Sequence, residues 1–235
     1  MTASTESAGP PPRDARSTPA HETLTDYAVD EIRKRIVIGE IAAGSKIGVD
    51  FIAKELAVSR IPVREAFREL LAEGLVEMYP HRGAVVAGIA RRDVEDGYRL
   101  LEVLEVMAVE RAAATAPAET ASRMRVHLQR LGALREAGQL SPLALLEEHR
   151  SFHFAVFDAL ETGMLERTAR SLWHACERFI NASARGDRVE QAHHEHLELV
   201  RYLEAGDVIG AVAVTQMHVR HGRHAALRGL GFDPS

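Results

Sequence analysis

The feature that most constrains the fold is an arginine-rich stretch in the first third of the chain. Arg60, Arg64 and Arg68 recur every four residues, so a helix would align them in one cationic stripe. Ser59 stands where its hydroxyl can cap that helix, and Pro62 falls in the first turn, where a missing N–H costs little. A helix with one buried face and an outward row of arginines is suited to the major groove of DNA, because guanidinium groups bind phosphates or the edge of guanine.

The segments before this stretch predict a helix-turn-helix. An amphipathic helix is expected over residues 24–38, and a shorter helix over 49–56. In the shorter helix, Phe51, Ile52 and Leu56 are expected to be buried. The three residues that follow form the turn into the arginine helix, which gives the order helix, turn, second helix.

The segments after this stretch predict a wing. Gly74 ends the arginine helix, and residues 75–79 and 84–88 are expected to form two strands joined at 80–83. The tip of such a hairpin would reach a minor groove. Residues 21–90 carry nine Lys or Arg against eleven Asp or Glu, so DNA binding must rest on a local patch and not on an overall basic field.

Six short motifs follow one another through this region: Ile38-Gly39-Glu40, Ala43-Gly44, Leu56-Ala57-Val58-Ser59-Arg60, Pro62-Val63-Arg64-Glu65-Ala66, Glu73-Gly74-Leu75-Val76 and Arg82-Gly83. Together they resemble the winged helix of GntR-type bacterial transcription regulators. The DNA-contacting residues that this resemblance implies are Ser59, Arg60, Arg64, Arg68, Arg82 and Gly83.

The sequence departs from the GntR pattern in two places. Ile61 stands where a small hydroxyl residue is common, and Asp50 and Phe51 lie where some members place another DNA-binding arginine. The preferred operator sequence therefore cannot be carried over from the family. Because a lone winged helix binds weakly, we expect a homodimer on a near-palindromic site of double-stranded DNA.

The length and composition bound the rest of the chain. Its 235 residues leave room for a small module and a larger domain, and the formal net charge of −5 fits a soluble protein. Residues 1–21 are rich in Ser, Thr, Ala and Pro and are expected to form a disordered tail, followed by the winged helix-turn-helix over 22–90. The lone cysteine, Cys176, fits a cytoplasmic setting, and the absence of a long apolar run argues against a membrane partner.

Residues 91–230 show helical periodicity throughout. Asp93 is expected to cap the first of these helices, and Ser141 followed by Pro142 to open the third. We expect six helices, over 94–116, 118–137, 142–160, 164–184, 188–205 and 208–228. Short links between them predict an antiparallel bundle of six to seven helices, so the fold class as a whole is mainly α.

Four histidines in this region are candidate metal ligands. His149 and His153 are four residues apart and therefore share one face of a helix. His196 and His218 lie on the two last helices. Imidazoles from three neighbouring helices that converge in a bundle would form a site for a divalent transition metal. Packed or surface histidines are the ordinary alternative.

The same region is similar to the FCD ligand-binding domain of the FadR subgroup of GntR regulators. The matching stretches are Arg99-Leu100-Leu101-Glu102, Phe152-His153, Glu195-His196, Ala205-Gly206-Asp207 and the segment from Ala211 to His218. In metal-binding members an Asp and three His hold the ion, and here His149 occupies the Asp position. His149 is then either a fourth ligand, or the other three histidines hold the ion alone. An all-nitrogen site favours zinc, nickel or copper over magnesium or calcium, with zinc or nickel as the leading candidates.

These observations predict a DNA-binding transcriptional regulator that responds to a small carboxylate. The carboxylate would fill an open position on the metal, and Arg99 would bind it by a forked contact unless it pairs with Glu95 or Glu102. Binding would shift the spacing of two winged helices in a dimer. Release of DNA by effector is the commoner outcome among similar regulators, so we expect a repressor. We do not expect an enzyme.

Two alternatives remain open at this point. The bundle could bind an acid directly without a metal. A metal-dependent enzyme in a helical bundle is the other alternative, with Glu147, Glu148 or Glu195 close to the histidines in sequence. The enzyme reading leaves the arginine helix and the wing unexplained.

Overall fold

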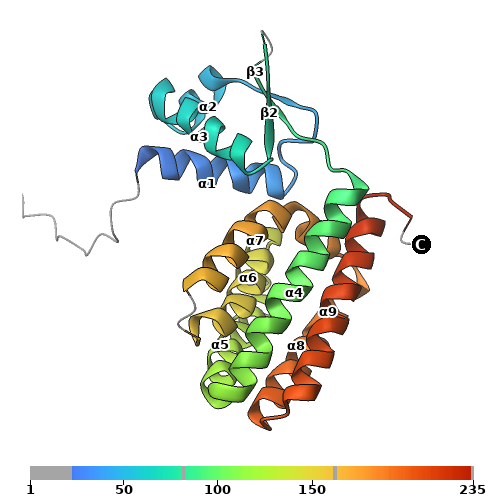
Figure 1. The fold of residues 1–235 in the computed structure, drawn as a ribbon. Coiled ribbons are helices and arrows are strands. Elements are labelled where there is room, and N and C mark those ends of the chain that lie inside the picture. Colours follow the sequence, from blue (N-terminus) through green and yellow to red (C-terminus); the bar gives the residue numbers. More distant parts are fainter. Residues whose placement is uncertain (1–22, 81–82, 161–162, 234–235) are drawn as a thin grey trace, which may run out of the picture.

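The computed structural model describes residues 23–80, 83–160 and 163–233, which form a small domain seated on one end of a helical bundle (Figure 1). The tail expected over 1–21 lies outside the described residues, and so does Arg82.

The small domain is a helix-turn-helix with a three-stranded sheet. Its elements are α1 (Leu24–Val37), β1 (Lys46–Ile47), α2 (Val49–Glu55), α3 (Arg60–Ala72), β2 (Val76–Tyr79) and β3 (Gly83–Val86). The strands are antiparallel in the order β1-β3-β2, with Val76 opposite Val86 and Ile47 opposite Ala84. The helices and the hairpin wing confirm the predicted fold, and β1 is a short strand that the sequence analysis did not anticipate.

Two local predictions in this domain are wrong. Phe51 is 61% exposed, because α2 has only two turns and its buried side is occupied by Ile52 and Ala53. Ser59 does occupy the N-cap position of α3, but its side chain makes no capping hydrogen bond.

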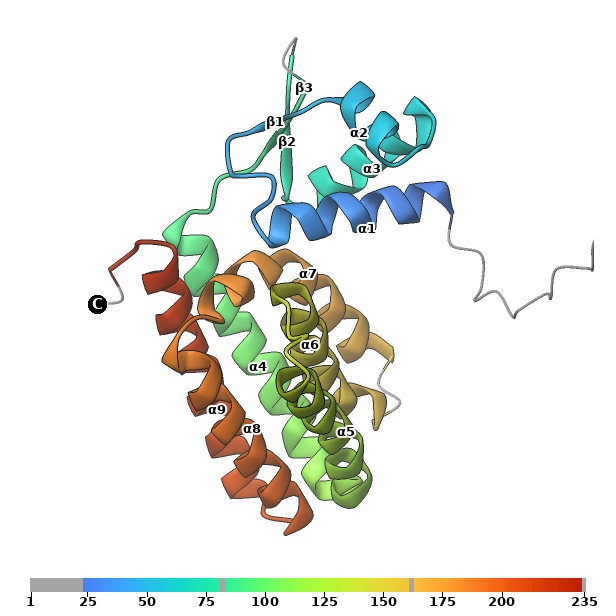
Figure 2. The same ribbon diagram turned by 180° about the vertical axis from the view of Figure 1, so that it is seen from behind.

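The larger domain confirms the predicted bundle, with six helices in its described residues (Figure 2). They are α4 (Arg91–Thr115), α5 (Pro117–Glu136), α6 (Pro142–Asp158), α7 (Gly163–Ser183), α8 (Asp187–Glu204) and α9 (Val208–Gly229). Helix α9 packs against α4, α7 and α8, and α5 packs against α6 and α8. None of the helices in the described segments is long and apolar enough to cross a membrane.

Helix starts and close contacts in the bundle follow from particular residues. Ser141 caps α6 by accepting a hydrogen bond from the Ala144 amide at 3.1 Å, as the sequence predicts. Asp93 is not the cap of α4, because the helix begins two residues earlier and Asp93 lies in its first turn. Helices α4 and α7 approach closely at Gly97, where a Cβ atom would lie 2.8 Å from Sγ of the buried Cys176.

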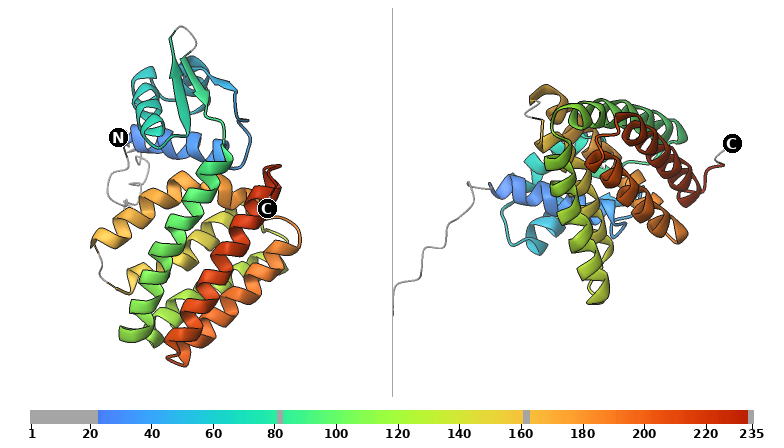
Figure 3. Two further views of the ribbon diagram at one scale, coloured as in Figure 1. Left: turned by 45° about the vertical axis from the view of Figure 1, so that its right-hand side comes forward. Right: turned by 90° about the horizontal axis from the view of Figure 1, so that it is seen from below.

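Helix α7 joins the bundle to the small domain. Figure 3 shows it running beneath α1 at the junction. Asn181 on α7 donates a hydrogen bond from Nδ2 to the carbonyl of Val37 at 2.9 Å. Arg178, one turn earlier, donates from Nη1 to the carbonyl of Ala87 at 2.9 Å in a buried contact. The end of α1 and the segment after β3 are thereby both fixed to one helix of the bundle.

Candidate metal centre and DNA-facing surface

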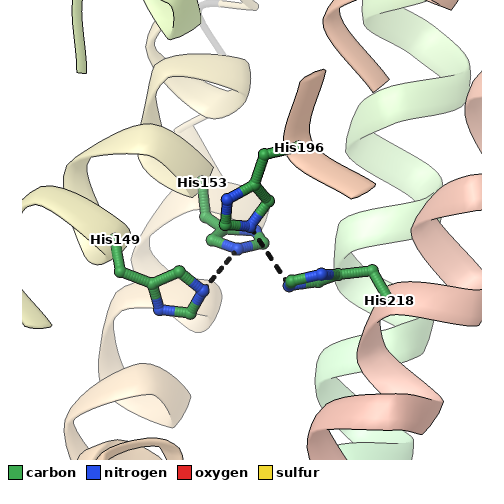
Figure 4. A group of neighbouring side chains, drawn as sticks. All are labelled: His149, His153, His196 and His218. Atoms are coloured by element: carbon green, nitrogen blue, oxygen red, sulfur yellow. Dashed lines mark hydrogen bonds between the residues drawn. The ribbon is translucent and has the colours of Figure 1, made fainter. Parts of the chain in front are cut away.

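Four histidines from three helices of the bundle point toward a common centre (Figure 4). His149 and His153 lie one turn apart on α6, His196 lies on α8, and His218 lies on α9. The sequence predicted this set, and the structure brings all four together. We call these four residues the histidine site.

The spacing of the nitrogens suits one metal ion. Nε2 of His153 lies 3.1 Å from Nε2 of His149, and Nε2 of His196 lies 3.3 Å from Nε2 of His218. The four ligand atoms all lie within 4.8 Å of one another. Tetrahedral zinc with bonds of about 2.0–2.1 Å places neighbouring nitrogens about 3.3 Å apart. The donor set therefore fits a transition-metal ion of that size.

The imidazoles of His149, His196 and His218 are held neutral, as metal ligands must be. Burial lowers the pKa of His149 and of His196 well below the ordinary value, and the neighbouring histidines lower it further. Burial also lowers the pKa of His218 to about 4, although its hydrogen bond with Glu195 acts in the opposite direction. At neutral pH these three rings therefore carry lone pairs and not an extra proton.

Two buried carboxylates orient two of the four rings. Glu105 on α4 lies 3.0 Å from Nδ1 of His153, and Glu195 on α8 lies 2.8 Å from Nδ1 of His218. Burial raises the pKa of Glu195, but its bonds to His218 and His221 outweigh that effect and bring the value to about 2. An ionised carboxylate only accepts hydrogen bonds, so it favours the tautomer with the proton on Nδ1 and the lone pair on Nε2.

A buried arginine completes the polar surroundings of the histidine site. Arg188, at the start of α8, donates from Nη1 to Glu195 at 2.7 Å and from Nη2 to the carbonyl of His218 at 3.1 Å. Neither Arg188 nor Glu105 was predicted from the sequence as part of this site. A signal for Glu105 was present, because it continues the buried spacing of Tyr98 and Leu101 along α4, where a carboxylate is out of place unless it has a partner.

The histidines border a cavity of about 270 Å³ inside the bundle. Its other walls are largely apolar and include Leu101, Trp173, Ile180 and Val219. Arg99 was expected beside this site, but the structure does not bring it there. Its side chain is 65% exposed and lies 3.7 Å from Asp96, because the neighbouring Tyr98 takes the inward face of α4.

The arginine stripe lies on the exposed side of α3. Arg60, Arg64 and Arg68 are exposed, and Nε of Arg60 lies 2.7 Å from Oδ1 of Asp50 on α2. Within the described part of the chain, Arg64 and Arg68 form no ion pair. Glu65, which could have neutralised them, instead accepts a hydrogen bond from Thr25 at 3.0 Å. We call the exposed residues of α2 and α3 the DNA-facing surface.

Two further residues named from the sequence lie outside α2 and α3. Ser59 is exposed at the start of α3. Gly83 begins β3 with a φ of +77°, a backbone conformation that side chains other than glycine rarely adopt. This conformation explains why the wing needs glycine at its tip.

Comparison with known proteins agrees with both halves of the fold. Residues 24–86 match the model of the bacterial regulatory proteins of the gntR family, and residues 96–221 match the model of the FCD domain. The chain therefore belongs to the GntR regulators that carry a C-terminal FCD domain. This is a family of transcriptional regulators and not of enzymes.

Individual relatives cover most of the chain. BphR, an HTH-type transcriptional regulator of Paraburkholderia xenovorans (strain LB400), is 28% identical over 84% of this chain and 82% of its own length. A protein of Paenarthrobacter nicotinovorans, described as a probable D-xylose utilization operon transcriptional repressor, is 30% identical over 79% of this chain and 80% of its own. The solved structure of McbR/YncC of Escherichia coli has a TM-score of 0.71 at 20% identity, covering 85% of this chain and 95% of that one, and supports the fold alone.

Proposed function

We propose that this protein represses transcription by binding an operator as a homodimer, and that a small carboxylate held at a divalent metal in the bundle changes its affinity for DNA. The observation that supports this most strongly is the convergence of four imidazoles on a cavity lined in part by helix α7, the helix that also bonds to the small N-terminal domain. We place the boundary between the two functional units near residue 90, between the end of β3 and the start of α4.

The histidine site would hold the metal through His153, His196 and His218, with His149 as a fourth nitrogen donor. A bound ion, zinc or nickel by the choice of ligands, would supply positive charge and a coordination position for a carboxylate oxygen. Glu105 and Glu195 would keep the imidazoles in the ligating tautomer. The proposed ligand set contains no carboxylate, but two carboxylates contact the Nδ1 atoms of ligand histidines and supply negative charge near the ion.

The charges around the site support an anionic effector. The carboxylates of Glu105 and Glu195 and the guanidinium of Arg188 sum to one negative charge beside a doubly positive ion. An acid with one carboxylate would neutralise the remainder, and the apolar walls of the cavity would cover its carbon atoms. Arg188, which the structure places at the cavity, is the better candidate than Arg99 for steering that acid.

Helix α7 is the candidate path from the cavity to DNA. Trp173, Ile180 and Ser183 on α7 line the cavity, while Arg178 and Asn181 on the same helix bind the DNA-reading domain. An effector that favours one position of α7 would therefore change the position of α1 and α3. Coupling of this kind is worth about 1–3 kcal/mol in typical regulators.

A second copy of the chain has a suitable surface on α4. Leu100, Val103 and Met107 are 55%, 56% and 45% exposed and follow a helical spacing, so they form an apolar stripe on the outside of the bundle. We propose that this stripe packs against its counterpart in the dimer. Replacing Val103 with Glu is expected to shift the protein from dimer to monomer in sedimentation, and an unchanged dimer would move the interface elsewhere.

Elemental analysis of protein purified without a histidine tag tests the metal. We expect close to one equivalent of zinc or nickel per chain, and less than about a tenth in His196→Ala. His194→Ala is the matched control, because His194 is exposed two residues earlier on the same helix. Full metal content in His196→Ala would reject the histidine site, and an unchanged response to acids in that variant would favour an effector pocket without metal.

Regulation is tested on the upstream region of the protein's own gene. We expect specific retardation of that duplex, reduced when a small acid such as acetate, succinate or citrate is added to the zinc-loaded protein. Trp173 is the only tryptophan of the chain and lies beside His149 and His153, with ring centroids 5.6 Å and 5.3 Å away, so its fluorescence reports binding of the acid. Equal affinity for that duplex and for random DNA would contradict a specific regulator.

A further inference from the structure

The DNA-facing surface carries two large apolar side chains that no contact within the described protein accounts for. Ile61 on α3 is 68% exposed and Phe51 on α2 is 61% exposed. Each directly follows a member of the Asp50–Arg60 ion pair, whose 2.7 Å contact holds the starts of the two helices together. Ile61 and Phe51 therefore lie within a charged surface and not on an isolated apolar face.

The position of Ile61 on α3 matches that of the arginines. It lies three residues before Arg64 and seven before Arg68, so all three share one side of the helix. The opposite side of the helix holds the buried core residues Val63, Phe67 and Leu70. Whatever approaches Arg64 and Arg68 from solvent must also meet Ile61.

Resting on the DNA binding proposed above, we infer that Ile61, with Phe51 on the neighbouring helix, reads the 5-methyl group of thymine in the major groove. Among the four bases thymine alone presents a methyl group in that groove, and apolar side chains recognise it by contact. An isoleucine has no hydrogen bond to offer a base edge, so its contribution must come from excluding water around such a methyl. The neighbouring arginines supply the attraction to phosphate and guanine that brings the duplex to this surface.

The Asp50–Arg60 ion pair indicates where in the operator this thymine should lie. Asp50 pairs with Nε of Arg60, and this ion pair restrains the guanidinium and leaves its two terminal nitrogens for a guanine edge. Because Ile61 is the next residue, the methyl that it reads is expected to lie within one or two base pairs of that guanine. Each half-site of the operator should then contain a guanine with a thymine close to it, on either strand.

Base analogues test the inference directly. The preferred duplex is first selected from a random library with the full-length protein, and each thymine is then replaced in turn by deoxyuridine, which lacks only the methyl. Loss of one buried methyl costs about 0.8 kcal/mol, or about fourfold in affinity for one half-site, at about 1.4 kcal/mol per factor of ten. We expect one such sensitive thymine in each half-site.

The protein variants assign that effect to the two side chains. In Ile61→Ala the deoxyuridine duplex and the thymine duplex should bind with nearly equal affinity, and in Phe51→Ala the difference should shrink. Ile209→Ala is the control, because Ile209 is 84% exposed on α9 and far along the chain from the DNA-facing surface. Removing an exposed side chain leaves the core intact, and unchanged circular dichroism confirms folding.

The outcomes separate the inference from the proposed function. Specific binding in which no thymine is sensitive to loss of its methyl, or in which the sensitivity persists in both variants, overturns the inference alone. Binding without preference for any sequence overturns the proposed function together with it.

Discussion

The DNA-facing surface and the histidine site are built in opposite ways. The first is a set of exposed side chains on two adjacent short helices, with Arg64 and Arg68 free of ion pairs among the described residues. The second is a set of one half-buried and three buried histidines from three helices, and two of these histidines are held by the buried carboxylates Glu105 and Glu195. A surface of the first kind can change its target by single substitutions, whereas a site of the second kind tolerates few changes because its parts support one another.

The largest effect that would sharpen this contrast is expected on DNA binding. Arg64→Ala removes a guanidinium from each half-site, and each such contact is worth about 1–3 kcal/mol, so affinity for the operator should fall about a hundredfold or more. Metal content and thermal stability should stay unchanged. Arg130→Ala, an exposed arginine on α5, serves as the control. A drop in metal content or melting temperature in Arg64→Ala would mean that the two regions are not independent.

A second effect is expected from acid on the metal-free protein. His218 has its pKa lowered by burial to about 4, so the unfolded chain binds a proton below pH 6.5 that the folded chain refuses until about pH 4. Stability of the bundle should therefore fall as the pH falls through that window, by roughly 1.4 kcal/mol per pH unit for one proton. Urea unfolding followed by Trp173 fluorescence measures this. A free energy of unfolding that does not change between pH 6.5 and pH 4 would contradict the burial of the His218 imidazole.

A third effect tests the carboxylates behind the ligands. Glu105→Gln should weaken metal binding by about tenfold to a hundredfold, the usual range for loss of a group that orients a ligand. The operator affinity of the metal-free protein should not change. Glu110→Gln, an exposed glutamate on the same helix, provides the comparison. Equal zinc affinities of the two variants in a competition titration would remove Glu105 from the site.

The smallest effect concerns the junction between the two regions. Asn181→Ala deletes one hydrogen bond to α1 and should lower stability by about 1 kcal/mol. It should also reduce the change in operator affinity caused by whichever acid acts on the wild type. Without this hydrogen bond, a shift of α7 on binding the acid would be transmitted less to α1. Gln129→Ala on the exposed side of α5 is the matched control. A full response in Asn181→Ala would place the coupling in another contact.

The same contrast explains what could be predicted from the sequence. The arginine stripe occupies one helix, so spacing alone predicted it, and the four histidines were found because helical spacing and motif agree. The tertiary surroundings were harder to predict. Arg188 reaches His218 from 30 residues away, and the inward turn of Tyr98 in place of Arg99 depends on how α4 packs. The burial predicted for Phe51 was wrong because the sequence does not show which side of the short helix α2 packs against the domain.

The close approach of α4 and α7 has a consequence for oxidative stress. Cys176 is sealed against Gly97, and burial raises the pKa of its thiol to about 12. Since the thiolate is the species that reacts with peroxides and alkylating reagents, this sulfur is chemically silent at cellular pH. Oxidation of this thiol is therefore not expected to switch this regulator, in contrast to regulators with reactive thiols.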